Sequence, residues 1–232
     1  MDAAARLVDA LLFDLDGTLI DSMPIHGETW RMLHDDHGLP FEPDAFFHQT
    51  AGRSLGEITA DLLAHLPHED RQRAGELKEA RYREIAQQRL NMIEGVPAVH
   101  ALARTLGVKM AICTAAPRAN IRVAQERFAV LAQMDTVVSP ADGLRGKPHP
   151  DIFLEAARRL GVDPARCLVF EDAPLGVEAA RRAGMAAIAL TTELDGEDFL
   201  HFDNLVGHMA DFRRIDLRAT LEQRRLKETD HA

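Results

Sequence analysis

The chain has little cysteine, few aromatic residues and no excess of basic side chains. Its two cysteines, Cys113 and Cys167, lie inside apolar stretches without CxxC spacing, which argues against a disulfide framework or a zinc site and favours buried thiols. The 27 Lys and Arg are outnumbered by 37 Asp and Glu, for a formal net charge of −10. Nucleic-acid backbones are bound by clustered Lys and Arg, so this balance argues against a nucleic-acid partner.

Long apolar runs are also missing. No stretch approaches the length that crosses a bilayer, and residues 1–14 lack a basic start followed by a long apolar segment. We therefore expect a cytosolic protein without a membrane partner. The 232 residues suffice for one large domain, or for a main domain with a smaller insert. A phosphorylated small molecule remains compatible with the negative charge, because it needs only a local positive site.

Short apolar stretches alternate with helix-like segments over most of the chain. The stretches are continuous, which is typical of strands buried on both faces of a sheet, and they span residues 9–14, 108–114, 135–139, 167–172 and 186–190. Helical patterns bounded by Gly or Pro cover residues 96–107, 116–130, 150–161 and 174–184. The alternation predicts an α/β fold with a Rossmann-like parallel sheet covered on both faces.

Residues from about 24 to 91 depart from this alternation, with several helical patterns and no convincing strand. We predict that residues 22–92 form an inserted α-helical cap domain and that residues 1–21 and 93–232 form the core domain. Ligands of open α/β folds bind at the carboxyl ends of the strands, so we expect the cap over that edge. The Arg-rich tail from residue 212 is predicted to form a short amphipathic helix with a solvated face.

Two predicted strands end in carboxylates, which an apolar stretch normally excludes. Asp14 and Asp16 lie in the sequence DLDGT, and strand geometry places their side chains on one face, roughly 6 to 7 Å apart. Glu171 and Asp172 follow a second strand. Four carboxylates at one sheet edge need compensating charge, and oxygen ligands suit Mg²⁺, so the pattern predicts a magnesium site. The alternative for the first pair is an ordinary turn, which DG often marks.

Other polar groups are expected at the same edge. Lys147, in GKPHPDIF ahead of a predicted helix, can supply positive charge, although a surface lysine is the alternative. Thr114 and the Ala115 amide, at the end of another strand, can donate hydrogen bonds. These groups around an ionised aspartate suit phosphoryl transfer, in which the carboxylate attacks phosphorus. A second aspartate can protonate the leaving oxygen and later deprotonate water.

In this order the motifs resemble those of the haloacid dehalogenase (HAD) superfamily, in its β-phosphoglucomutase-like and phosphoglycolate-phosphatase-like branch with a helical cap. The matching motifs are DLDGT at 14–18, Thr114, Lys147 in GKPHPDIF and EDAPLGVEAARRAGM from residue 171, and the match spans roughly residues 8–190. The resemblance implies a HAD-like core with an inserted helical cap. It makes Asp14 the nucleophile and a Mg²⁺ ligand, and Asp16 the general acid/base whose backbone carbonyl also meets the metal.

The same resemblance assigns the remaining core residues. Thr114 and Lys147 would hold the phosphoryl oxygens, and Lys147 would also orient the nucleophile. Asp172 would be a metal ligand, with Glu171 either a direct ligand or a support for one. The dehalogenating members differ at the second acidic position and do not need magnesium, so Asp16 argues for phosphate chemistry.

The predicted cap contributes three candidate substrate-binding residues. His26 stands where similar enzymes often place a histidine near the acid/base, with a capping or surface role as the alternative. The sequence TAGRSLGEI (50–58) resembles the family's specificity loop, in which Gly52 lets the backbone bend and Arg53 can reach an anionic group. Leu55 falls where the mutase branch carries its phosphate-binding arginine.

Other residues of the predicted cap are expected to be exposed to solvent and to have no binding role. Lys78 is interpreted as an exposed helical lysine, with a substrate-binding role as the alternative. The histidines of HDDH (34–37) and HLPH (65–68) are expected to be solvated, because neither group has a convincing third metal ligand.

The predicted function is that of a HAD-type phosphoric monoester hydrolase: a Mg²⁺-dependent phosphatase acting on a sugar phosphate or phosphoglycolate-like metabolite through an aspartyl phosphate. The alternative is a phosphomutase of the β-phosphoglucomutase type. Thr18, where mutases typically have an apolar residue, and the displaced cap arginine favour the phosphatase. A non-catalytic binding protein on the same fold is a third hypothesis. We expect a monomer or weak dimer.

Overall fold

The computed structural model describes residues 7–50 and 53–223 and contains a six-stranded parallel sheet in the order β5-β4-β1-β6-β7-β8. The strands are β1 (Ala10–Phe13), β4 (Lys109–Cys113), β5 (Thr136–Val138), β6 (Cys167–Glu171), β7 (Ala186–Leu190) and β8 (Leu205–Met209). Central β1 pairs with β4 on one side and β6 on the other, so three strand ends that carry polar residues are neighbours. The predicted Rossmann-like α/β fold is confirmed.

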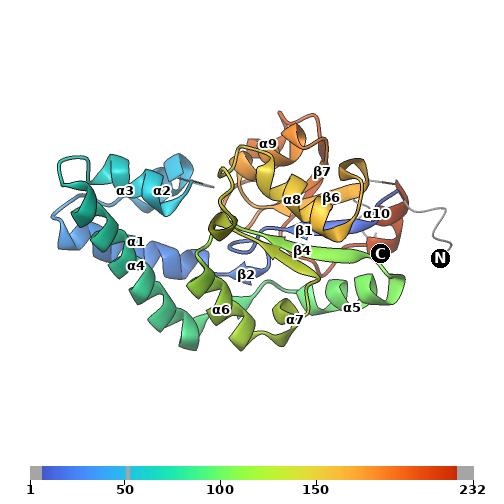
Figure 1. The fold of residues 1–232 in the computed structure, drawn as a ribbon, viewed down its shortest axis with the longest axis horizontal. Helices are drawn as coiled ribbons and strands as arrows, with labels where there is room; N and C mark the ends of the chain where they lie inside the picture. Colours follow the sequence, from blue (N-terminus) through green and yellow to red (C-terminus); the bar gives the residue numbers. More distant parts are fainter. Residues whose placement is uncertain (1–6, 51–52, 224–232) are drawn as a thin grey trace.

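Helices cover both faces of the sheet (Figure 1). One face packs against α5 (Val96–Leu106), α6 (Arg118–Arg127), α7 (Ala129–Ala132) and α10 (Leu217–Gln223), and the other against α8 (Asp151–Leu160) and α9 (Pro174–Arg182). Strand side chains alternate between faces. Leu11 and Phe13 therefore join the first apolar cluster, whereas Leu12 joins the second. Short 3₁₀ turns follow at η2 (Pro140–Asp142), η3 (Pro164–Arg166) and η4 (Gly196–Phe199).

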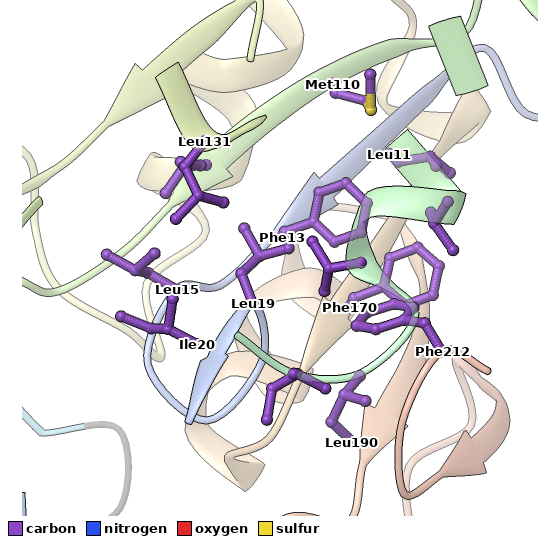
Figure 2. Close-up of a cluster of buried hydrophobic side chains, with 14 of the residues drawn as sticks. Leu11, Phe13, Leu15, Leu19, Ile20, Met110, Leu131, Phe170, Leu190 and Phe212 are labelled. Atoms are coloured by element: carbon purple, nitrogen blue, oxygen red, sulfur yellow. The ribbon is translucent and has the colours of Figure 1, made fainter. Parts of the chain in front are cut away.

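Three phenylalanines anchor the first cluster (Figure 2). The rings of Phe13 and Phe170, on adjacent strands, stack with centroids 4.9 Å apart. Phe212, which follows β8, packs against both, at 6.1 and 5.4 Å. Such offset or tilted aromatic contacts stabilise a core beyond the area they bury. They fix the ends of β1 and β6, which carry the acidic residues, relative to one another.

Between Asp21 and Asn91 the structure is helical, with α1 (Met23–Asp36), α2 (Pro43–Thr50), α3 (Leu55–Leu62) and α4 (His68–Arg89). We call residues 23–89 the helical segment; it lies to one side of the sheet in Figure 1. It has its own apolar cluster around Trp30, Leu33, Ile58 and Leu63. A two-stranded antiparallel pair, β2 (Ile20–Asp21) and β3 (Asn91–Met92), joins it to the sheet.

Some predicted elements differ from the structure. The helix expected over 116–130 is interrupted at Phe128, whose extended backbone separates α6 from α7. Strands β2, β3 and β8 were not predicted: two are only two residues long, and β8 is half exposed rather than a continuous buried stretch. The predicted tail helix is confirmed as α10, and residues 224–232 lie outside the described part. Among described residues, no helix has the length and apolarity to cross a membrane; the cytosolic location stays a prediction.

Gly176 tests how closely α9 packs against the end of β6. A Cβ at this position would lie 1.9 Å from the Glu171 carboxyl carbon, so Gly176→Ala must displace that buried side chain. We expect the free energy of unfolding to fall by about 2 kcal/mol or more. Gly56→Ala in α3 is the control, because a Cβ there meets nothing within 4 Å. In urea titration the control should unfold no more easily than the parent protein, and an equally stable Gly176→Ala would contradict the packing.

Candidate active site

Residues from the ends of β1, β4 and β6 converge on one cavity of about 160 Å³, whose opposite wall is formed by the helical segment. Nearly all sequence-predicted site residues line it: Asp14, Asp16, Thr114, Ala115, Lys147, Glu171, Asp172, His26 and Arg53. Gly52 lies outside the described residues. The structure therefore brings the four motifs together, at the sheet edge where open α/β folds bind ligands.

Lys147 is the central cation of the site. Its ammonium lies 2.6 Å from Asp14 Oδ1 and also contacts Glu171 Oε1. All three side chains are buried, with 4% of the Lys147 side chain exposed. The alternative of a surface lysine is therefore wrong. The other Glu171 oxygen accepts a hydrogen bond of 3.1 Å from the Ala173 amide.

Burial and charge shift the pKa values of this group in opposite directions. Burial lowers the pKa of Lys147, but Asp14 and Glu171 raise it by more, so the side chain stays an ammonium. Burial raises the pKa of Asp14 to about 7, against the lowering effect of Lys147. Burial, Glu171 and Asp14 also raise the pKa of Asp172 well above its ordinary value. One lysine therefore leaves the acidic cluster short of positive charge.

The cluster has the donor set of a divalent cation site. Carboxylate oxygens of Asp14, Glu171 and Asp172 lie within 4.8 Å of one another. Space beside Asp172 depends on Gly17, where a Cβ would lie 2.1 Å from Asp172 Oδ2 and where φ is +72°. Clustered carboxylates, of which Asp14 and Asp172 have raised pKa values, suit a hard cation with oxygen ligands.

Thr114 presents a hydroxyl at the end of β4. Its Oγ1 accepts a hydrogen bond of 3.0 Å from the Ala116 amide, and its side chain is 1% exposed. A hydroxyl group can donate one hydrogen bond while it accepts another, so Thr114 can also donate into the cavity that it lines. Thr18 is buried as well and donates to Asp172 Oδ1 at 3.4 Å.

Asp16 has a different environment from Asp14. Its Oδ1 accepts hydrogen bonds from Ser22 Oγ at 2.6 Å and Tyr82 OH at 3.5 Å, and lies 3.3 Å from His26 Nε2. Burial raises the pKa of Asp16, but the contacts with His26 and Ser22 lower it below the ordinary value overall. The two aspartates of DLDGT therefore face opposite walls: Asp14 contacts Lys147, and Asp16 contacts residues of the helical segment.

Two expectations for the helical segment are wrong. Lys78 is not exposed: 2% of it is accessible, and its Nζ lies 2.7 Å from His26 Nδ1 and 2.9 Å from Glu79 Oε1. His34 of the HDDH stretch is buried rather than solvated, because its Nδ1 bonds the Pro40 carbonyl and Phe46 packs on its ring. Both side chains lie on the buried faces of their helices. The sequence does not show which face of these helices is buried, because charged residues occur on all sides of them.

Arg53 and Leu55 both line the cavity, as expected for residues of the predicted specificity loop. The Arg53 guanidinium, however, pairs with Asp61 Oδ2 at 2.5 Å and so has an anionic partner within the helical segment. Leu55 adds an apolar surface beside Trp30 and Ile58.

Several residues of the site were not identified from the sequence. Ser22 and Tyr82 bond Asp16, and Asn120 Nδ2 donates to Glu79 Oε2 at 2.5 Å. A serine near the start of a helix or an asparagine in PRAN also occurs as an ordinary cap, so the sequence contains no signal that separates these residues from others.

Comparison with known proteins identifies the family. The model of the haloacid dehalogenase-like hydrolases matches residues 8–184. This chain belongs to that family. A validoxylamine A 7′-phosphate phosphatase of Streptomyces hygroscopicus subsp. limoneus is 32% identical, covering 87% of this chain and 94% of the relative. The β-phosphoglucomutase of Bacillus subtilis is 27% identical, with 95% and 98% covered. A crystal structure of a family IA HAD hydrolase from Entamoeba histolytica superposes with a TM-score of 0.83, at 26% identity, covering 93% and 98% of the two chains.

Family membership confirms the resemblance that the motifs indicated, together with the HAD-like core and the enzyme class. The similarity extends over nearly the whole of both chains, so the helical segment is part of what is shared. As a HAD-type phosphoric monoester hydrolase the protein is an enzyme, and the converging motifs are its candidate active site.

Asp172→Asn tests the shortage of positive charge. Without divalent cations the substitution replaces a buried carboxyl group, whose ionisation burial and its acidic neighbours disfavour, by a neutral amide, so we expect the free energy of unfolding to rise, on the order of 1 kcal/mol. Added Mg²⁺ should stabilise the parent protein but not this variant. Thermal unfolding in EDTA and in Mg²⁺ measures both effects, with Asp203→Asn, an exposed position, as the control. An Mg²⁺ response retained in Asp172→Asn would contradict the assignment.

Lys147→Met tests the buried ammonium. The variant leaves Asp14 and Glu171 without their cation, so we expect a loss of about 3 kcal/mol in the free energy of unfolding when no metal is present. The loss should grow as pH rises above about 7, because the parent Asp14 ionises there beside Lys147, whereas in the variant the same ionisation would bury a carboxylate without its cation. Arg158→Met, which removes an exposed partner of Glu155, should cost less than about 1 kcal/mol. Urea titrations at several pH values measure the losses. If Lys147→Met lost no more stability than Arg158→Met at every pH, a buried ion cluster would be excluded.

Proposed function

We propose that this enzyme is a Mg²⁺-dependent phosphatase that hydrolyses a small phosphomonoester, a sugar phosphate or a similarly small phosphorylated metabolite, through a phosphoryl group carried on Asp14. The observation that carries the proposal is the ammonium of Lys147 held 2.6 Å from the buried Asp14 carboxylate, in a cavity shared with Asp16 and Thr114. A carboxylate that lies beside a fixed cation and hydroxyl donor is suited to attack phosphorus while its neighbours hold the phosphoryl oxygens.

In this proposal two side chains perform the covalent chemistry. An Asp14 oxygen bonds to phosphorus as the bond to the alcohol oxygen breaks, and Asp16 gives its proton to that oxygen. A water molecule then attacks the phosphorus of the aspartyl phosphate, Asp16 takes its proton, and Asp14 is released with inorganic phosphate. Contacts with Ser22 and His26 lower the pKa of Asp16, so its protonated form gives up the proton readily in the first step, and the proton taken from water in the second step restores it.

Other residues bind rather than react. Thr114, the Ala115 amide and Lys147 would hold the phosphoryl oxygens. Asp14, Asp172 and the Asp16 carbonyl would hold Mg²⁺, with Glu171 holding Lys147. The ion supplies positive charge that offsets the negative charge of the phosphoryl oxygens.

Three observations support a phosphatase over the alternative phosphomutase. Leu55 lines the cavity at the position where the mutase branch carries its phosphate-binding arginine, and Arg53 is paired with Asp61. Thr18 adds a buried hydroxyl where mutases typically have an apolar residue. Identity to the phosphatase relative is also higher than identity to the mutase, 32% against 27%.

We further propose that residues 22–92 act as a cap domain, as the sequence predicts. Antiparallel β2 and β3 form a narrow connection to the sheet, and the apolar cluster around Trp30 gives the helices a core of their own. Closure would exclude bulk water and opening would release the alcohol and phosphate.

Asp14→Asn tests the nucleophile. We expect kcat for phosphate release to fall at least about 10³-fold, because an amide oxygen is a far weaker nucleophile than a carboxylate. A panel of phosphorylated sugars and small phosphomonoesters, with and without Mg²⁺, measures the rate. The exposed Asp203→Asn serves as the control and should remain within twofold of the parent protein. Normal turnover by Asp14→Asn would exclude the mechanism.

The same panel separates the alternatives when sugar isomers and free phosphate are quantified separately. A phosphatase releases phosphate in step with substrate loss, whereas a mutase forms an isomer without release. Folded protein with no Mg²⁺-dependent turnover on any member would favour the non-catalytic hypothesis.

A further inference from the structure

A chain of buried polar contacts runs from Asp16 through the helical segment to the core helix α6. His26 Nε2 lies 3.3 Å from Asp16 Oδ1, and Lys78 Nζ lies 2.7 Å from His26 Nδ1. Lys78 also pairs with Glu79 Oε1 at 2.9 Å, and Glu79 Oε2 accepts from Asn120 Nδ2 at 2.5 Å. The chain therefore links α1, α4 and α6, three helices that are separate in the sequence.

Hydrogen-bond chemistry determines which group donates and which accepts at each of these contacts. The Lys78 ammonium has protons only to donate, so His26 Nδ1 must accept and the ring's proton must lie on Nε2. That Nε2–H then points at Asp16 Oδ1. Stacking of the His26 ring on Tyr82, with centroids 4.2 Å apart, fixes the plane of the imidazole. Lys78 thus determines which tautomer of His26 faces the acid/base aspartate.

Lys78 in turn depends on Glu79 and Asn120. A lysine that is 2% exposed needs an anionic partner, because burying a lone charge is costly. Glu79 is that partner, and it is 6% exposed, so its second oxygen also needs a donor. Asn120, 4% exposed, supplies one from the core side. Arg83 donates to Asn120 Oδ1 at 3.2 Å, which fixes the orientation of the amide.

The two Asn120 contacts join opposite sides of the cavity. Glu79 and Arg83 lie one turn apart on α4, and Asn120 is in α6 of the core. Arg127, further along α6, donates to the Gln87 and Leu90 carbonyls at the end of α4. These bonds form only when α4 packs on α6, so the placement of Lys78 is tied to this packing.

We infer that Asn120 and Glu79 are positioning residues for the acid–base step, because they hold Lys78 against His26 and thereby orient His26 toward Asp16. The inference rests on the proposed function for the role of Asp16. It adds to that function a contact between α6 and α4, through which the packing of these two helices determines the orientation of His26 beside Asp16.

Asn120→Asp is the most specific test, because it keeps the size of the side chain and the acceptor for Arg83 but turns a carboxylate oxygen toward Glu79. We expect kcat for phosphate release to fall roughly tenfold to a hundredfold, with KM changed by less than about threefold. Gln125→Ala, on the same helix with a bond to the Leu131 carbonyl, is the matched control and should stay within about twofold. Asn120→Ala, which adds no charge, gives the same comparison if Asn120→Asp does not fold.

The double variant Glu79→Gln with Asn120→Asp exchanges donor and acceptor. The amide at 79 can donate to the carboxylate at 120, and the number of negative charges is unchanged. We expect it to recover at least about fivefold of the kcat that Asn120→Asp loses. No recovery, or a single variant that alters unfolding stability and KM but not kcat, would overturn the inference.

Trp30 provides a readout that needs no activity. It is the chain's one tryptophan, it is 5% exposed, and Lys78 Nζ lies 4.7 Å from its ring centroid. Acrylamide quenching of its fluorescence should increase at least about twofold in Asn120→Asp and return toward the parent value in the double variant. Unchanged quenching in Asn120→Asp would contradict the inference. Because this measurement uses no substrate, it stays informative if the Asp14→Asn test refutes the proposed function.

Discussion

The Lys147 ammonium between Asp14 and Glu171 is the interaction on which the site depends. It lies after β5 and ahead of α8, and it reaches the ends of β1 and β6 because those strands are neighbours at the centre of the sheet. Carboxylates at this depth are tolerated only with compensating charge. The fold brings these charges together. The parallel strands β1 and β6 place the acidic residues at one edge of the sheet, and the connection from β5 to α8 places Lys147 beside them.

Asp14 and Asp16, separated by one residue, acquire different chemistry from this arrangement. Asp14 lies among other acids with a pKa raised to about 7, whereas hydrogen bonds from the helical segment lower that of Asp16. Opposite shifts in one site commonly mark different roles. For Asp14 to attack as a carboxylate, more positive charge is needed than Lys147 supplies, and the Asp172 carboxylate beside it can help to bind that charge.

The sequence was sufficient for the fold and for the residues at the strand ends, because continuous apolar stretches and carboxylates at their ends are local signals. It was insufficient for Lys78 and His34, which are buried although their helices carry many charged residues. Which face of such a helix packs inward depends on the neighbouring helices. The Asn120–Glu79 contact is harder still to predict, since it joins α6 to α4 and neither residue type is distinctive in its own segment.

Calorimetric titration of Mg²⁺ into metal-free protein at pH 7, repeated in buffers of different ionisation enthalpy, tests most directly whether the acidic cluster lacks a cation. The account predicts one binding site and the release of about half a proton or more into the buffer, because Asp14, with its pKa of about 7, and Asp172, with a raised pKa, must ionise to bind the ion. Binding without proton release, or no binding at the site, would contradict it.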